Sequence, residues 1–264
     1  MTPLDTAFAA MMADPEDVGA RLAYYARLAD GELYVLLETE AEGEVLSPRV
    51  FPLDSGPVVL AFDREERLAE FTTIPAPYAA LPGRVLVRML AGQGDAPRLG
   101  LGVNLGTETA WIVTPEALDW LAETLDHAPQ PAEARPLAFH APFGLPRALM
   151  EALDAKLARA GGLASGAVLA AADYEGGGRG HMLAFLDAAG GAEAALAQAV
   201  AEALAFSGLE AGQIDVTFLP AAAPAAQAML RHGLRIDLPE PPAQPEPRAP
   251  AAPGMDPDKP PRLK

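Results

Sequence analysis

The chain has 264 residues, a formal net charge of −17 at pH 7 and no cysteine. Without thiols there can be no disulfide, zinc–thiolate site, iron–sulfur cluster or cysteine nucleophile. A surface this acidic also repels nucleic-acid phosphates and anionic lipid headgroups, which argues against binding to either.

Residues 1–126 show the pattern of an α+β domain, and they hold 21 acidic and 8 basic residues, a net charge of −13. Thr2-Pro3, Asp14-Pro15 and Thr114-Pro115 each combine a capping side chain with a proline, the signature of a helix start. A further helix is expected from Asp63, with Glu66 in the capping-box position. The remaining expectations are strands over 33–37, 45–51, 58–62, 99–103 and 110–113 and a short helix over 84–90.

Two of these helices carry apolar residues at helical spacing. Val18, Leu22, Tyr25 and Ala29 predict one buried face behind the Asp14-Pro15 cap. In the helix behind Thr114, Trp120 is predicted to be buried together with its leucine neighbours. Both faces are therefore expected to contribute to the core of the first domain.

Residues 127–142 hold four prolines and show no sustained periodicity, so they are predicted to form an interdomain linker. The second domain, residues 143–238, shows the order α-β-β-α-β-α-β, typical of a small mixed sheet packed with helices. Its expected elements are a helix through Leu149, Leu153 and Leu157, a hairpin over 167–172 and 181–186, a helix over 194–206, a strand over 214–218, a helix over 224–231 and a strand over 234–238.

The C-terminal tail, residues 239–264, is rich in proline and almost free of apolar residues other than alanine. Such a composition cannot bury enough surface to offset the entropy of ordering the chain. We therefore expect this tail to be disordered.

No motif predicts a catalytic, cofactor-binding or metal-binding residue, and no cofactor is expected. Ser165 lacks the glycine spacing of a nucleophile elbow. The stretches 100–106 and 175–180 are rich in glycine but join strands, so neither would place a phosphate at a helix N-terminus. The acidic run Glu38, Glu40, Glu42 and Glu44 lacks the pattern of a calcium loop.

The four histidines are His127, His140, His181 and His232, and none has another within metal-ligand spacing. His181 is the one reservation, because it begins a predicted strand beside the glycine loop. If the fold brought His181 and two or more acids into a closed cavity, the chain would have to be interpreted as a catalyst.

Residues 59–106 resemble the N-terminal domain of the SseB family, the bacterial enhanced serine sensitivity proteins. The resemblance is carried by Val59-Leu60-Ala61-Phe62-Asp63, Leu81-Pro82-Gly83-Arg84, the run from Leu90 to Gly94, and Leu101-Gly102-Val103-Asn104 before Gly106. Leu105 stands where the family has a proline. Residues 143–238 are similar in order and length to the family's C-terminal domain.

This resemblance implies a cytoplasmic, bacterial α+β protein without an assigned reaction. The N-terminus shows no secretory pattern and no stretch has the apolar length of a membrane helix, which agrees with that expectation. We expect a non-enzymatic regulatory or interaction protein with a protein partner, and the sequence specifies no oligomeric state. Two alternatives stay open: an enzyme with an unrecognised acid and histidine site, and a small-ligand sensor, for example of an amino acid.

Overall fold

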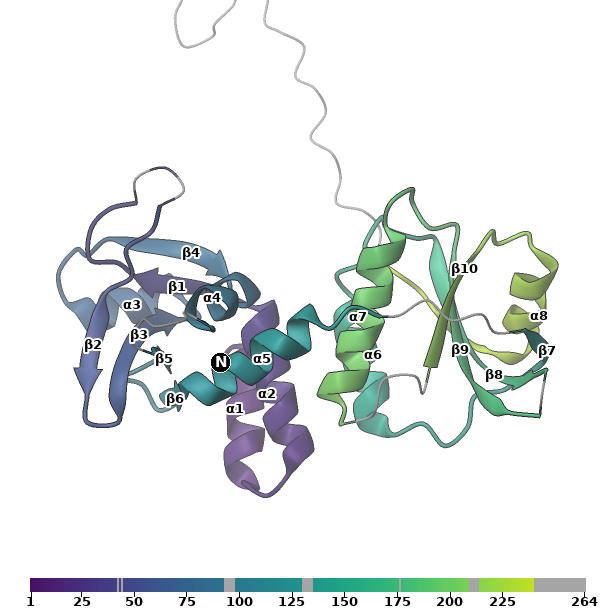
Figure 1. Ribbon diagram of the computed structural model, residues 1–264, viewed down its shortest axis with the longest axis horizontal. Coiled ribbons are helices and arrows are strands. Elements are labelled where there is room, and N and C mark those ends of the chain that lie inside the picture. Colours follow the sequence, from purple (N-terminus) through teal and green to yellow (C-terminus); the bar gives the residue numbers. More distant parts are fainter. Residues whose placement is uncertain are drawn as a thin grey trace, which may run out of the picture.

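The computed structural model describes residues 1–41, 43, 45–92, 98–129, 135–175, 177–208 and 214–239. Over these residues the chain forms two α+β domains, each a mixed sheet packed against helices, and they lie side by side (Figure 1). The predicted fold class is therefore confirmed. Residues 240–264 of the predicted disordered tail lie outside the described part of the chain.

The first domain is built on a sheet in the order β4-β1-β3-β5-β6, with β2 also paired to β3. The helices α1, α2, α4 and α5 cover one face and form the larger core, whereas α3 covers the other face over a smaller apolar cluster. The strands are β1 (Glu32–Leu36), β2 (Val50–Leu53), β3 (Gly56–Phe62), β4 (Tyr78–Pro82), β5 (Gly100–Val103) and β6 (Trp111–Val113). The helices are α1 (Pro3–Ala13), α2 (Val18–Asp30), α3 (Glu65–Thr72), α4 (Gly83–Leu90) and α5 (Pro115–Asp126).

The second domain is built on a sheet in the order β10-β9-β8-β11, with β7 also paired to β8. Helices α6 and α7 pack on one face of this sheet and α8 packs on the other. The strands are β7 (Pro136–His140), β8 (Gly166–Tyr174), β9 (Arg179–Leu186), β10 (Ile214–Leu219) and β11 (Leu234–Ile236). The helices are α6 (Arg147–Leu157), α7 (Glu193–Phe206) and α8 (Pro224–His232).

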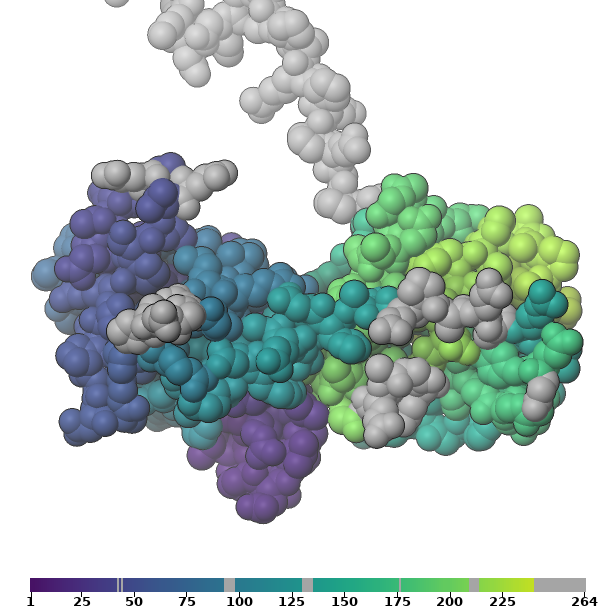
Figure 2. Space-filling model, in the orientation of Figure 1, coloured from purple at the N-terminus to yellow at the C-terminus, as the bar shows by residue number. Residues whose placement is uncertain are grey.

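Both sheets share one spatial pattern. The rows β4-β1-β3-β5 and β11-β8-β9-β10 each contain two antiparallel pairs followed by one parallel pair. The helix-rich faces of the two sheets point toward each other, so that α2, α4 and α5 meet α6 and α7 between them (Figure 1). Figure 2 shows the two lobes in contact, with the α1–α2 hairpin projecting away from them.

The structure differs from the expectations in several places. The strand expected over 45–51 is found as β2, which begins only at Val50 and pairs with β3. The helix start predicted at Asp14-Pro15 is wrong, because Asp14 ends α1 and Asp17 caps α2. Helix α3 begins at Glu65 without a side-chain cap, and Asp63 bonds the side chain of Arg67 instead.

Strand β4 was not expected. Strand β7 lies within the predicted linker and pairs with β8. Its proline, Pro136, is the first residue of an edge strand, a position where proline is tolerated. The domain boundaries at 126, 142 and 238 remain predictions.

Candidate functional site

An apolar groove lies between helices α2 and α5 on the first domain. Its volume is about 490 Å³. Two of the residues that line it are exposed, Trp120 at 39% and Val18 at 53%. The residues that line the groove are Val18, Arg21, Leu22, Tyr25, Thr114, Glu116, Ala117 and Trp120.

Two well-capped helix starts place these residues. The carboxylate of Asp17 accepts hydrogen bonds from the backbone N–H groups of Gly19 and Ala20 at the start of α2. Thr114 caps α5 by accepting from the N–H of Ala117, with Pro115 at the first helical position. The groove is lined by the first turns of both helices, so these two caps define one of its ends.

The groove exists because each helix turns a second apolar stripe away from the core. In α2 the fully buried residues are Tyr24, Leu28 and Ala29, so Leu22 and Tyr25 lie beside the core face. The rings of Tyr25 and Trp120 meet across the groove, with centroids 5.6 Å apart at an angle of 55°. These two rings form its aromatic floor.

The second domain contacts two of the residues that line the groove. The ring of Phe206, at the end of α7, makes an edge contact with Trp120 at 6.4 Å between centroids and is itself part of the first domain's core. Gly208 lies beside Leu22, and a Cβ atom on that glycine would be 3.7 Å from Leu22 Cδ1. Phe206 and Gly208 therefore connect the second domain to the side chains of Trp120 and Leu22.

Opposite charges flank the apolar floor. Arg21 and Glu116 both line the groove, and Glu116 also pairs with Arg98 at 2.7 Å. The pKa of the Glu116 carboxyl is lowered by the backbone N–H at the start of α5 and by the Thr114 hydroxyl. The pKa of Tyr25 is raised because its hydroxyl is partly buried. Glu116 is therefore charged at neutral pH and can attract a basic group.

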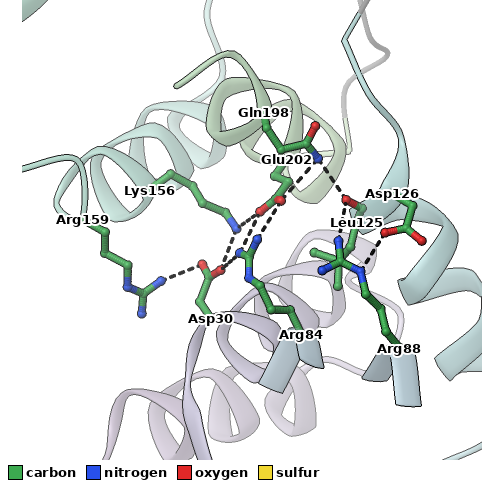
Figure 3. A network of polar contacts seen from close by, with 9 residues as sticks. All are labelled: Asp30, Arg84, Arg88, Leu125, Asp126, Lys156, Arg159, Gln198 and Glu202. Carbon is green, nitrogen blue, oxygen red and sulfur yellow. Dashed lines mark hydrogen bonds and ion pairs between the residues drawn. The ribbon is translucent and has the colours of Figure 1, made fainter. Parts of the chain in front are cut away.

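A buried ion cluster joins the two domains next to this groove (Figure 3). Lys156 Nζ of α6 lies 2.5 Å from Glu202 Oε2 of α7 and 2.9 Å from Asp30 Oδ1 at the end of α2. Arg84 of α4 lies 2.7 Å from the same Asp30 oxygen and 3.2 Å from Glu202. Arg159 reaches Asp30 from the solvent side at 2.8 Å. Each domain supplies one acid and at least one cation.

The carboxylate of Asp30 stays ionised because cations surround it. Burial alone would raise the pKa of Asp30, but Lys156, Arg159 and Arg84 lower it below its ordinary value. The side chains of Asp30, Lys156 and Glu202 are 4%, 6% and 2% exposed. Such a cluster fixes the relative position of two domains, because separating them would leave buried charges unpaired.

The residues that carry the sequence resemblance have structural roles. Asn104 follows β5 in the left-handed conformation, with φ of 51°, and is almost fully buried. Its side-chain oxygen accepts a hydrogen bond from the N–H of Asp63, at the end of β3, at 3.0 Å. Asn104 therefore ties together the carboxyl ends of the two parallel strands. Beside it, Arg67 pairs with Asp63 at 2.7 Å and with Asp5 at 2.8 Å.

Within the part of the chain that the structure describes, His181 contacts an aromatic ring and belongs to no metal-type cluster of acids. Its ring packs against Phe143 at 5.3 Å between centroids, and its Nε2 accepts the N–H of Phe143 at 3.5 Å. His140 contacts Asp173 at 2.8 Å, and Arg179 with His140 lowers the pKa of that carboxyl to about 2. Within the described ranges, no group of three or more histidines and acids has the geometry of a metal site.

The fold and the groove define a class of protein: two mixed α+β domains joined by a buried ion cluster, with an aromatic groove on the first. Residues 4–120 match the family model of the SseB protein N-terminal domain. Residues 4–120 therefore form a domain of the SseB N-terminal type, and all the residues that line the groove fall within the matched range. Searches of curated proteins and of solved structures gave no match. The assignment of 143–238 to the family's C-terminal domain remains a prediction.

The groove was not predicted, because its residues were assigned to the core. Val18, Leu22 and Tyr25 were expected on the buried face of α2, but the buried residues of that helix are Tyr24, Leu28 and Ala29. Trp120 was expected on the buried face of α5, but it is 39% exposed. The buried positions of α5 are Leu118, Leu121, Ala122 and Leu125, and Trp120 lies beside that stripe rather than in it. One signal was present: α2 carries more apolar residues than a single core face needs. The surplus stripe of Val18, Leu22 and Tyr25 is the wall of the groove.

Proposed function

We propose that this protein is a non-enzymatic interaction module that binds a short apolar segment of a protein partner, with a basic residue beside it, in the groove between α2 and α5. The observation that carries the proposal is the exposure of Trp120 in an apolar groove. Exposed aromatic side chains in a concave site supply much of the binding energy at protein interfaces, because they bury a large area at little cost in conformational entropy.

The charge of the domain supports a basic segment. The first 126 residues have a net charge of −13, and Glu116 lines the groove. An acidic field speeds the approach of a cationic segment and repels acidic ones. We place this role in the bacterial cytoplasm, in line with the family. Within the described residues, no helix has the length and hydropathy needed to cross a membrane.

Site-specific cross-linking tests the proposal. A photoreactive phenylalanine analogue at Arg21, which lines the groove, is expected to give a discrete adduct in living cells, with the linked segment of the partner identified by mass spectrometry. The same analogue at Leu137, which is 71% exposed on the second domain, is the matched control. Adducts of equal yield and identity from both positions would refute the proposal.

Two groove variants sharpen this test. Trp120→Ser removes the aromatic anchor, and Val18→Asp places a charge on an exposed apolar position of the groove. Loss of an interface anchor costs about 2 kcal/mol or more, equivalent to about a 30-fold weaker affinity. Both variants should therefore abolish the Arg21 adduct while leaving the far-UV circular dichroism unchanged. An adduct that survives both changes would not come from the groove.

A second candidate function, a small-ligand sensor, is favoured by one observation. The groove has the volume of a small-molecule site and carries Arg21 and Glu116, charges that match the carboxylate and ammonium groups of a free amino acid. A thermal-shift screen with the common amino acids distinguishes the two candidates. A ligand at 100 times its Kd adds about 2.7 kcal/mol of stability. A shift that disappears in Trp120→Ser would establish the sensor.

A further inference from the structure

The chain itself contains a segment with the chemistry that the groove selects. Residues 240–264 include nine prolines, and the run Pro257-Asp258-Lys259-Pro260-Pro261-Arg262 places two prolines three residues apart, followed by an arginine. Prolines at this spacing dock on aromatic-lined grooves as a polyproline II helix, which loses little conformational entropy on binding.

The dimensions of the groove suit this spacing. Val18 and Tyr25 both line it and lie two helical turns apart along α2, or about 10 Å. In a polyproline II helix, residues three apart lie on the same edge and are separated by about 9 Å. Two prolines at this spacing can therefore lie along the groove between Val18 and Tyr25.

Charge complementarity points in the same direction. Residues 257–264 carry Lys259, Arg262 and Lys264 against one acid, Asp258, and they contain two of the three lysines of the whole chain. The first domain is strongly acidic, and Glu116 lies at the end of the groove where both helices begin. An arginine two residues beyond the second proline would meet this carboxylate.

The reach of the segment is sufficient. The 18 residues from Glu240 to Pro257 span about 56 Å if extended as polyproline II. A globular body of about 240 residues has a radius of gyration of about 18 Å, so this length is about three times that radius. Because tail and groove belong to one molecule, their effective concentration is in the millimolar range, at which even a weak contact is populated.

We propose that residues 257–262 of the chain's own C-terminal tail bind in the groove between α2 and α5, so that a partner must displace the tail. This inference rests on the proposed function, because it concerns the same groove. It assigns to the tail the role of an intramolecular competitor. A partner segment then binds the whole chain more weakly than a free groove. Its apparent affinity is the affinity for a free groove multiplied by the fraction of molecules whose groove is free.

A paramagnetic label locates the tail. The chain has no cysteine, so Leu263→Cys gives a single attachment point for a nitroxide in the otherwise intact protein. We expect broadening of amide resonances concentrated on the first turns of α2 and α5 and on the indole of Trp120. In the full chain carrying Pro257→Ser and Pro260→Ser, the matched control, this localised broadening should disappear. Broadening spread evenly over both domains in the unaltered tail would overturn the proposal.

A peptide of residues 254–264 added to the full chain separates the two proposals. We expect it to bind the variant with the altered tail at least about tenfold more tightly than the wild type, because a groove that is 90% occupied lowers the apparent affinity tenfold. Equal affinity for both chains, lost in Trp120→Ser, would overturn the tail contact but retain the groove as a binding site. No binding to either chain would overturn the tail contact, and the cross-linking experiment then decides the proposed function alone.

Mixing distinguishes one molecule from two. Spin-labelled chains without isotope are mixed with isotope-labelled chains that carry no nitroxide. Broadening in this mixture would come from a tail that docks on a second copy. If the sample that carries both labels on one chain then loses its broadening at high dilution, the intramolecular contact is overturned. Absence of broadening in the mixture supports the proposal.

Discussion

Removal of the Lys156 ammonium should destabilise the protein strongly. In Lys156→Met the alkyl chain remains, but the cation that lies 2.5 Å from Glu202 and 2.9 Å from Asp30 is lost. Among the residues that the structure describes, Glu202, which is 2% exposed, then keeps only Arg84 at 3.2 Å as a cationic partner. Breaking a buried pair by removing one partner costs about 3–5 kcal/mol, because the other charge stays desolvated. We expect a loss in this range.

A double variant shows whether the cost comes from the unpaired charge. In Lys156→Met with Glu202→Leu, both partners become apolar, and replacing a buried pair in this way is often neutral. We expect a cost below about 2 kcal/mol, so the two changes should couple by about 2–3 kcal/mol. Arg147→Met is the control on the same helix, because this side chain is 91% exposed in its pair with Glu151 and should contribute little.

Urea unfolding followed by tryptophan fluorescence and by circular dichroism measures these energies. Trp120 contacts Phe206 across the domain junction, so its emission reports on domain separation. Transitions that coincide by both probes in the wild type and separate in Lys156→Met would show that the ion cluster couples the domains. A cost below about 1 kcal/mol for Lys156→Met, the value of an exposed pair, would refute the reasoning.

The pH dependence of this cluster has a definite sign. The pKa of Asp30 is lower in the folded protein than its ordinary value of 3.8, so the folded state favours the ionised form. The stability that Asp30 contributes is therefore complete above pH 3.8 and is lost as the pH falls through the lower folded value. In Asp30→Asn this part of the acid-induced loss should disappear from unfolding curves recorded over the acidic range. An unchanged acid profile would contradict the assignment.

Three further changes test the packing of the first domain by urea unfolding. Tyr24→Phe should be neutral or stabilising, because among the described residues its buried hydroxyl has no hydrogen-bond partner; a marked loss would reveal a bond that the hydroxyl makes. Gly83→Ala should prevent folding or cost several kcal/mol, since its Cβ would lie 1.8 Å from the carbonyl oxygen of Leu28; wild-type stability would refute this contact. Asn104→Ala should lower the free energy of unfolding by about 2–4 kcal/mol, because the bond to the Asp63 N–H is lost and alanine is strained in the left-handed backbone. Asn104→Gly tolerates that backbone and should cost less. Equal costs for the two variants would contradict the strain argument.

Local patterns in the sequence predicted most helices and strands because caps and periodicity are local properties. The Thr2 and Thr114 caps form as expected, and the order α-β-β-α-β-α-β of the second domain is confirmed. Strand β4 escaped prediction because Tyr78-Ala79-Ala80-Leu81-Pro82 offers little apolar alternation. It is ordered by pairing with β1 along its whole length. Tertiary pairing thus decided the structure of a segment with a weak intrinsic preference.

The ion cluster could not be predicted, because its members come from four helices in two domains. Asp30 and Lys156 are 126 positions apart, and Arg84 and Glu202 are 118 apart. The sequence held one indirect sign: Lys156 directly precedes Leu157 of the apolar stripe on α6, and Glu202 interrupts an alanine-rich helix. A charge at a core position requires a partner, but only the fold identifies which one.

The groove and the ion cluster share one side chain, Phe206. Its ring touches Trp120 on the groove side, and the ammonium of Lys156 lies 5.3 Å from its centroid on the other. Variants at Trp120 and Lys156 are therefore connected through a common neighbour, and their energies should not add. Val18→Asp lies outside this chain of contacts and blocks the groove without disturbing the domain junction. If Val18→Asp abolishes binding at unchanged stability, the groove acts as a binding site independently of its role in joining the domains.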